Sequence, residues 1–199
     1  MFMSSHINVC QCDRLGCGNI MKVDTTGIHK ETADQEEMLP YDGVPASNKP
    51  AETDQDRMNN YKSLIQKVGG QKGIDPAIIA AIISRESRAG KALKDGWGYY
   101  KQAWGLMQVD KRYHTLRGGW DSEEHITQGT DILTDFLRQI KNKFPSWTPE
   151  QHLKGGIAAY NAGPRRVETY EEMDKHTIGH DYSNDVVAKA QWYKNNGGF

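Results

Sequence analysis

The clearest periodic signal along the chain is an unbroken apolar run, Ala77 to Ile83, that ends in the polar sequence Ser-Arg-Glu. Asp75 and Pro76 precede it as an N-cap residue and a proline at the first helical position, so the run predicts a helix. Positions 79, 82 and 83 lie on one side of such a helix, and Glu86 falls on the same side. The pattern therefore predicts a buried helix with a carboxyl on its apolar side, near its end.

Apolar residues at helical spacing predict four further helices, over about 53–68, 123–143, 148–160 and 183–195. Strand alternation is scarce and amounts to one short hairpin near residues 104–120. Residues 1–52 are polar and lack a sustained period, which predicts an irregular N-terminal arm whose middle, residues 19–27, docks on the rest of the protein. We expect a mainly α fold, with a helical bundle around the buried helix and one domain over 53–199.

Composition narrows the class of protein. No window approaches 18 apolar residues, which excludes a transmembrane helix, and the first residues lack the basic and apolar regions of a signal peptide. The net charge of −1 divides into −4 over residues 1–53 and +3 over residues 54–199. That bias is too weak to indicate nucleic acid, although a mildly positive body suits an anionic polymer. We expect neither a membrane nor a nucleic-acid partner.

Metal chemistry has little support in the sequence. All three cysteines, Cys10, Cys12 and Cys17, lie within the first 17 residues, so no disulfide can form in the body of the protein. They could form a partial metal site or a redox pair, but no fourth ligand stands at a zinc spacing, so we assign them no function. His176 and His180 are the only two histidines that lie close together in the sequence, and we interpret them as part of a solvent-exposed turn. No metal and no cofactor are expected.

Glu86 has two readings. A carboxyl shielded from water has a raised pKa and can protonate a poor leaving group such as a glycosidic oxygen. The ordinary alternative is an exposed glutamate that pairs with Arg85, Arg88 or Lys91, and periodicity alone favours it.

Two other stretches carry polar groups next to apolar runs. In WGLMQVDKRYH (residues 104–114), Gln108 and Asp110 alternate with apolar residues and His114 follows, so one face can line a cleft. In GGIAAYNAGPRRV (residues 155–167), Tyr160 and Asn161 offer a ring, a hydroxyl and an amide to a sugar before the helix ends. Taken singly, these stretches are more simply a strand with a solvated aspartate and a helix end with a packed tyrosine.

Together, the three stretches resemble the goose-type (g-type) lysozymes, in particular fish-like members, and more distantly the soluble lytic transglycosylases. The resemblance runs from about Gly18 to Tyr193 and rests on seven blocks in the same order. They are GNIMKVDTTG, ISRESRAGK, WGLMQVDKR, HITQGT, FPSWT, LKGGIAAYNAG and DYSNDVVAKAQWY. We read HITQGT as a packing block, with Thr127 and Gln128 capping or cross-linking helices. The resemblance implies an α+β lysozyme-like fold in which a small β-hairpin region lines the substrate cleft.

The resemblance also implies a function. It identifies the chain as an antibacterial muramidase, monomeric, that cuts the β-1,4 bond between N-acetylmuramic acid and N-acetylglucosamine in peptidoglycan. Glu86 matches the general acid, and Asp110 an aspartate that positions or activates the attacking water. The positions matched to the saccharide cleft are His114, Tyr160, Asn161, Gln108, Phe136, Ile132 and Tyr99. Hydrolysis with inversion needs roughly 6.5–9.5 Å between the two carboxyl groups, to admit water.

The chain departs from the family pattern in the cleft loop. Tyr99 stands where the family usually has a second aspartate, Lys101 to Ala103 lack the usual glycines, and Asp95 is the one nearby acid that could substitute. Two alternatives therefore stay open. One is a lytic transglycosylase, which uses a single glutamate and the substrate's own hydroxyl. The other is a non-catalytic protein that binds peptidoglycan or chitin oligosaccharides.

The second departure concerns cysteines. Gly16, Lys30, Asp42 and Gly73 occupy the positions of the two disulfides of bird members, so neither bridge can form. We expect easier local opening of the arm. The family is typically extracellular, but without a recognisable leader we expect this chain to stay in the cytoplasm or to leave by an unusual route.

Overall fold

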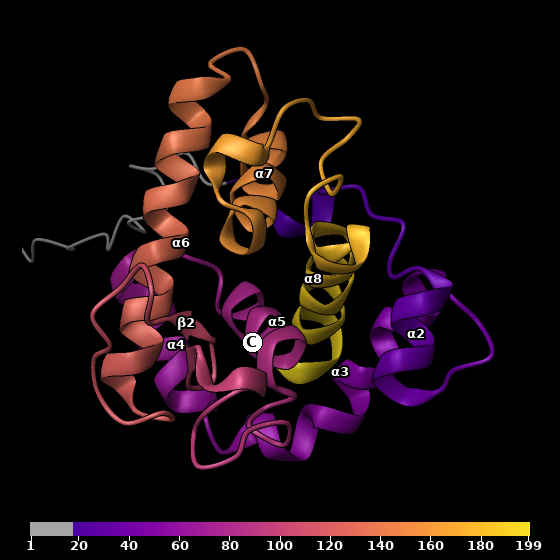
Figure 1. Cartoon of the computed structure of the whole chain (residues 1–199). Helices are drawn as coiled ribbons and strands as arrows, with labels where there is room; N and C mark the ends of the chain where they lie inside the picture. The colour runs from indigo at the N-terminus through magenta and orange to yellow at the C-terminus, as the bar shows by residue number, and fades with distance from the viewer. Residues whose placement is uncertain (1–17) are drawn as a thin grey trace, which may run out of the picture.

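The computed structural model describes residues 18–199, so the expectations for Cys10, Cys12 and Cys17 lie outside the described residues. The described part is mainly helical (Figure 1), as predicted. Its α-helices are α2 (Lys30–Glu37), α3 (Gly43–Asn59), α4 (Lys62–Lys72), α5 (Pro76–Ser87), α6 (Glu123–Lys143), α7 (Pro149–Ala162) and α8 (Tyr182–Trp192). A short antiparallel hairpin joins β1 (Ala103–Trp104) to β2 (Val109–Asp110), with Ala103 opposite Asp110.

Helix α5 is the buried helix that the apolar run predicts. Every residue from Ala77 to Ser84 is buried, and the helix contacts α3, α4 and α8, which surround it in Figure 1. The Asp75 side chain accepts a hydrogen bond from the Ala77 backbone nitrogen (3.0 Å), which caps the first turn. Arg88 ends the helix in the left-handed region, at φ 54°. The capping signal at Asp75 and Pro76 therefore places the beginning of α5 correctly.

The helices predicted near the C-terminal half are confirmed. Helix α6 has the predicted bounds, and α7 begins within one residue of its predicted start, with a capping box in which the Thr148 hydroxyl accepts from the Gln151 backbone nitrogen. Helix α8 ends at Trp192, and a π-helical turn, Tyr193–Gly197, continues the chain. Tyr193 is fully buried against the central cluster, as its spacing predicts.

The prediction of a single helix over 53–68 is wrong in its extent. The structure has two helices there, because the backbone nitrogens of Asn60 and Tyr61 bond three residues back, to Arg57 and Met58, which interrupts the α-helical ladder. Helix α3 also begins ten residues earlier than predicted, at Gly43. Its first turns bury small or polar side chains, Ala46, Ser47 and Ala51, and such residues give a weak apolar signal.

The prediction of irregular structure before residue 53 is wrong for residues 18–52, which contain α2 and the beginning of α3. The docking of residues 19–27 is confirmed: the Gln191 amide donates to the carbonyls of Ile20 (3.0 Å) and Val23 (2.8 Å). Ile20 and Val23 are also buried in the central hydrophobic cluster, but two apolar residues are too few to form a period in the sequence. The division of the chain at residue 52 stays a prediction.

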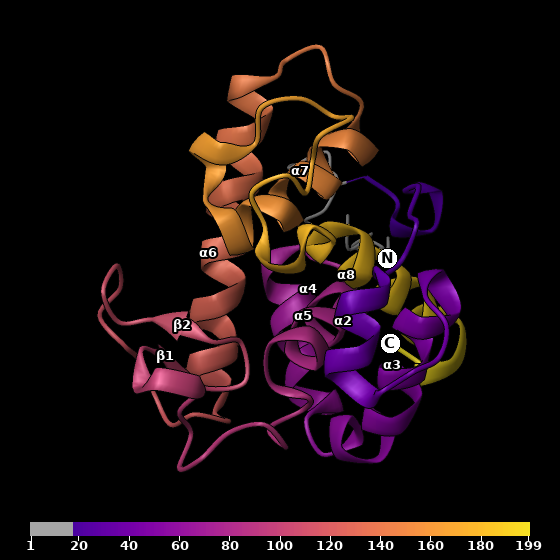
Figure 2. The same cartoon turned by 45° about the vertical axis from the view of Figure 1, so that its right-hand side comes forward.

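Residues 89–119, called here the hairpin lobe, hold β1 and β2 and stand beside α6, on the far side from α2 and α3 (Figure 2). Two consecutive residues fasten the lobe to the helices. The Ser87 hydroxyl donates to the Leu106 carbonyl (2.8 Å), and the Tyr160 hydroxyl donates to the Met107 carbonyl (2.8 Å). The Met107 nitrogen in turn donates to Nε2 of the buried His125 (3.0 Å).

None of the helices between residues 18 and 199 is long and apolar enough to cross a membrane.

Candidate active site

Glu86 lies in the last turn of α5, one residue before the Ser87 that fastens the hairpin lobe. Its side chain is half-buried, and Oε1 accepts a hydrogen bond from the Tyr182 hydroxyl at 2.5 Å. Removal of the carboxyl from water raises its pKa to about 7, against the weaker opposing effects of the Tyr182 hydrogen bond and the Arg85 charge. The carboxyl therefore has the property that a general acid needs near neutral pH.

Among the described residues, Glu86 forms no ion pair with a neighbouring cation, which was the ordinary alternative for this residue. Arg85 instead bonds Asp185 (2.9 Å) and Asp181 (3.1 Å), both fully buried. Arg88 bonds the buried Asp54 (3.0 Å) and Glu37 (2.5 Å). The two arginines that flank the acid in sequence are thus held by other carboxylates, and they leave Glu86 to its tyrosine.

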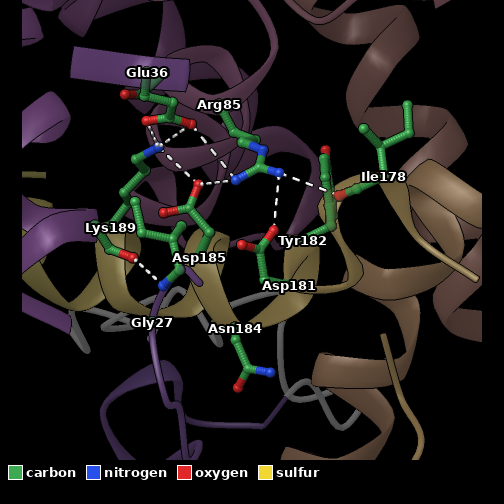
Figure 3. A network of polar contacts seen from close by, with 12 residues as sticks. Gly27, Glu36, Arg85, Ile178, Asp181, Tyr182, Asn184, Asp185 and Lys189 are labelled. Carbon is green, nitrogen blue, oxygen red and sulfur yellow. Dashed lines mark hydrogen bonds and ion pairs between the residues drawn. The ribbon is translucent and has the colours of Figure 1, made fainter. Parts of the chain in front are cut away.

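The contacts of Arg85 belong to an ion cluster of five charged side chains, drawn in Figure 3. The members are Glu36, Arg85, Asp181, Asp185 and Lys189. The Lys189 ammonium lies 2.7 Å from the Asp185 carboxylate and 3.0 Å from that of Glu36. The cluster links α2, α5 and α8, and Arg85 also lies over the Tyr182 ring, 5.6 Å from its centroid.

Tyr182 is a site residue that the sequence analysis missed. It begins α8 within the block DYSNDVV, it is almost fully buried, and its pKa is raised well above the ordinary value by burial and by the charge of Glu86. It lies 96 residues away from Glu86 in sequence, so no spacing rule could pair the two. The available signal was the position of Tyr182 directly after Asp181, in the block DYSNDVVAKAQWY that the chain shares with the family it resembles.

Asp110 ends β2 and is paired with Arg112. The Arg112 backbone nitrogen and Nε donate to Oδ1 (2.8 and 3.0 Å), and Nη2 donates to Oδ2 (2.6 Å). These bonds hold the pKa of Asp110 below its usual range, so it is an ionised carboxylate at neutral pH. Arg112 is a second residue that the sequence analysis left out.

The predicted cleft residues lie around this pair in different elements. His114 is half-buried, and its backbone nitrogen bonds the Asp110 carbonyl (3.1 Å). The Gln108 amide nitrogen donates to the Gly105 carbonyl (2.8 Å), and its side chain packs so closely on Gly98 that no Cβ fits there. Thus the lobe positions Asp110 and its neighbours through backbone contacts.

Helix α7 brings Tyr160 to the same region from the other side. Its hydroxyl bonds the lobe at Met107, and burial together with the charge of Glu86 raises its pKa well above the ordinary value. The Asn161 Oδ1 atom accepts from the Ile178 backbone nitrogen (2.8 Å), so the loop before α8 is held against the end of α7. Tyr160 and Ser87, the residue after Glu86, thus bond consecutive carbonyls of the lobe.

The remaining predicted positions are less directly connected. Ile132 and Phe136 are half-buried on α6, and Phe136 packs against the cluster that contains Ile140 and Val167. The Tyr99 side chain lies outside the described residues, and Asp95 is exposed in a turn at φ 52°. The role of Asp95 as a substitute acid stays a prediction.

In HITQGT, Gln128 cross-links α6 to the hairpin lobe rather than to another helix. Its amide donates to the Thr115 carbonyl (2.7 Å) and accepts from the Arg117 backbone nitrogen (2.9 Å).

A pocket of about 760 Å³ opens elsewhere, between Asp24, Lys154, Tyr170 and Asn184, and no predicted site residue lines it. Its buried cation, Lys154, already donates to the Asp24 carbonyl at 2.9 Å. Within residues 18–199, no three His, Cys, Asp or Glu side chains gather as metal ligands. The groups capable of acid–base chemistry therefore centre on Glu86 and Asp110.

Comparison with known proteins matches this arrangement to one family. A family model described as Lysozyme g matches residues 17–197. The chain belongs to the lysozyme g family. It is a lysozyme, and therefore a glycoside hydrolase, which confirms the resemblance seen in the seven sequence blocks.

Individual relatives agree along nearly the whole chain. Lysozyme g of the fish Epinephelus coioides is 57% identical over 195 residues, which cover 93% of this chain and all of that protein. Lysozyme g of the bird Casuarius casuarius is 58% identical over 183 residues, covering 92% of this chain and 98% of the other. A human relative, lysozyme g-like protein 2, is 42% identical over 180 residues, or 90% and 81% of the two chains.

Proposed function

We propose that this lysozyme hydrolyses the β-1,4 bond between N-acetylmuramic acid and N-acetylglucosamine in peptidoglycan, as an antibacterial muramidase, with Glu86 as the general acid. The observation that carries the proposal is the Glu86 carboxyl, whose pKa is raised to about 7 at the end of the most deeply buried helix. Family membership supports the substrate, because muramidase activity on peptidoglycan defines a lysozyme.

The proton transfer follows from the hydrogen bonds of Glu86. Since Oε1 accepts from Tyr182, Oε2 is the oxygen that carries the transferable proton. Burial keeps this proton on the carboxyl near neutrality, and the scissile glycosidic oxygen receives it as the bond to the sugar breaks. Tyr182 then stabilises the carboxylate that remains.

We assign Asp110 the positioning and activation of the attacking water, in a single displacement with inversion. Its two oxygens offer about four lone-pair directions, and Arg112 supplies three donors, the backbone nitrogen, Nε and Nη2. Nε also contacts Oδ2 (3.1 Å), so all four directions are engaged, and a water molecule binds Asp110 as the Arg112 side chain releases one of them. The saccharide is held by His114, Tyr160, Asn161, Gln108, Phe136, Ile132 and Tyr99, and the enzyme acts as a monomer.

One observation favours a second candidate, a lytic transglycosylase. The Arg112 bonds that depress the pKa of Asp110 also make its carboxylate a weaker base, which suits a reaction that needs no activated water. Product mass separates the two reactions, because hydrolysis adds one water to each cleaved bond whereas ring closure to a 1,6-anhydro sugar adds none. Whole-chain identity to lysozyme g proteins keeps hydrolysis first.

The test compares Glu86→Gln and Asp110→Asn with Asp135→Asn, which alters an exposed acid on α6. We expect Glu86→Gln to lower kcat on bacterial walls about 10³-fold and Asp110→Asn about 10²-fold. Asp135→Asn should stay active, and all three should keep the wild-type circular dichroism.

Full activity of Glu86→Gln would refute the proposed acid. Near-wild-type turnover by Asp110→Asn would move the water-activating role to Asp95 or to unassisted water. Saccharide binding by the wild-type protein without release of reducing ends or anhydro sugars would refute both reactions and support the alternative of a non-catalytic binding protein.

A further inference from the structure

The hairpin lobe has a charge opposite to that of the rest of the molecule. Residues 89–119 contain six Lys or Arg and two Asp, a net charge of +4, whereas the rest of the chain carries −5. The six cations, Lys91, Lys94, Lys101, Lys111, Arg112 and Arg117, are all exposed. A net charge near zero for the whole chain therefore conceals one strongly cationic surface.

Three of these cations have no internal partner. Arg112 is committed to Asp110 (2.6 Å), and Arg117 lies 3.5 Å from Asp131. Among the described residues, no carboxylate lies within ion-pair distance of Lys91, Lys94 or Lys101. Their ammonium groups are thus available to an outside ligand.

Two of the cations lie next to Trp97. The backbone of Lys94 pairs with that of Trp97, and the Lys111 ammonium lies over the Trp97 ring, 5.1 Å from its centroid. Lys101 precedes Gln102, whose carbonyl accepts from the Lys111 backbone nitrogen (3.0 Å). The hairpin therefore places Lys94 and Lys111 beside one half-buried tryptophan, and Lys101 next to the residue that pairs with Lys111.

The same lobe adjoins the proposed chemistry. Asp110 directly precedes Lys111, and the lobe is fastened by Ser87 next to Glu86. A polymer that places a glycosidic bond at Glu86 therefore brings its own side groups over the lobe. Carboxylates carried by that polymer reach the lysines without a second binding event, whereas a separate phosphate polymer would have to bind independently.

We propose that Lys91, Lys94, Lys101 and Lys111 form a docking surface for the stem-peptide carboxylates of peptidoglycan, so that the enzyme selects anionic glycan strands over neutral ones. This inference rests on peptidoglycan being the substrate, as proposed above. The surface raises affinity and association rate through charge and takes no part in bond cleavage.

The test uses Lys94→Glu/Lys101→Glu, a pair outside the proposed catalytic and saccharide-binding residues. The matched control, Lys22→Glu/Lys67→Glu, makes the same change in net charge at exposed positions outside the lobe. Each protein is assayed for binding to insoluble peptidoglycan stripped of phosphate polymers, and for hydrolysis of the neutral N-acetylglucosamine hexamer. The same peptidoglycan with amidated carboxyl groups is the third substrate.

We expect the lobe variant to bind stripped peptidoglycan about tenfold more weakly at low salt, with the difference lost at high salt. Hexamer hydrolysis should stay within about twofold of wild type, and the control variant should match wild type on both. Wild type should bind amidated peptidoglycan as weakly as the lobe variant binds the untreated form.

Three results would overturn the docking surface. Equal loss on the neutral hexamer would indicate a contact to the glycan or damage to the fold. Equal loss in the control variant would indicate overall charge rather than this surface. Loss only on walls that retain phosphate polymers would make those polymers the partner. Hexamer hydrolysis by wild type and its loss in Glu86→Gln test the proposed function separately.

Discussion

Glu86 and Tyr182 form the pair on which the proposed chemistry depends. Burial raises the pKa of the acid to about 7, and the Tyr182 hydroxyl, which donates to the charged form, acts in the opposite direction. Burial therefore keeps Glu86 protonated near neutral pH, so that it can donate its proton, and Tyr182 stabilises the carboxylate that remains after the transfer. The alkaline limit of activity should report this balance.

Removal of the Tyr182 hydroxyl should move that limit. Without its hydrogen bond, the carboxylate of Glu86 is less stable, its pKa rises further, and the acid stays protonated at higher pH. We expect Tyr182→Phe to shift the alkaline limb of the kcat/KM profile upward by about one pH unit. Tyr170→Phe, which loses a hydroxyl bonded to Asp24 instead, is the control. An unchanged limb in Tyr182→Phe would remove Tyr182 from the proposed mechanism.

The raised pKa of Glu86 also predicts a cost to stability. A folded-state pKa of about 7, against the ordinary glutamate pKa of 4.5, means that the group's favourable contribution to stability is complete below pH 4.5 and lost as the pH rises through 7. Glutamine does not titrate and can still accept from Tyr182. Urea denaturation should therefore show Glu86→Gln gaining about 3 kcal/mol over wild type between pH 4 and pH 8. A constant difference across this range would contradict the raised pKa.

Sequence could identify the acid but not its environment. The periodicity of Ala77 to Ile83 placed Glu86 on the apolar side of a helix, and the resemblance to lysozymes decided between the two readings. Tyr182 and the committed state of Arg85 depend on contacts about 100 residues apart in sequence, which local patterns do not contain. Asp110 and Arg112 are only two positions apart in sequence, but the geometry of their contact comes from the turn after β2.

At the scale of the helix, two polar groups fix the end of α5. The ion cluster holds Arg85 towards α2 and α8, while Asp54 on α3 holds Arg88 and accepts from the Ser84 hydroxyl (2.8 Å). Both sets of contacts come from residues within two positions of Glu86. The last turn of the helix is thereby prevented from fraying, although helix ends usually fray.

Replacement of Asp54 by alanine should show how much these contacts contribute to the free energy of unfolding. Asp54 is fully buried and bonded to Arg57 and Arg88, so Asp54→Ala removes the carboxylate of Arg57 and one of the two carboxylates that hold Arg88. We expect a loss of about 3–5 kcal/mol in the free energy of unfolding, measured with denaturant. Exposed Asp34→Ala, which breaks a surface pair with Lys30, should cost less than about 1 kcal/mol. Similar losses in both variants would contradict this account.

The early helices show where apolar patterns fail as predictors. Helices α5 and α6 were predicted because large aliphatic residues recur at helical spacing. Helix α3 begins with small and polar residues that pack closely, and α2 is attached through Glu36 and Glu37. Contacts made by short or charged side chains leave no apolar period, so residues 18–52 looked irregular in sequence.

At the scale of the molecule, a helical body and a hairpin lobe meet at Leu106 and Met107. The body contributes Glu86, and the lobe contributes Asp110. One of the fastenings depends on protonation, because the Met107 nitrogen donates to Nε2 of His125, which must be unprotonated to accept. Burial lowers the pKa of His125 to about 4 and so keeps the ring neutral.

Acid should therefore loosen the lobe before it unfolds the body. With a folded-state pKa of about 4, against the ordinary histidine pKa of 6.5, the stabilising effect of neutral His125 is complete above pH 6.5 and lost as the pH falls through 4. We expect hydrogen exchange to show faster opening of residues 104–110 at pH 4.5 than at pH 7, after correction for intrinsic rates. Residues 77–84 of α5 should keep their protection. Equal loss in both segments would mean global unfolding instead.

The attachment of the lobe at Leu106 and Met107 has a consequence for evolution and for engineering. Ser87 and Tyr160 hold the carbonyls of residues 106 and 107, while the stretch from Lys94 to Trp97 is a turn closed by its own backbone bond (2.9 Å). Insertions, deletions or grafted loops within that stretch can change which strands are recognised while the proton donor stays in place. The family can thus diversify its targets at one end of the hairpin and inherit its chemistry from the other.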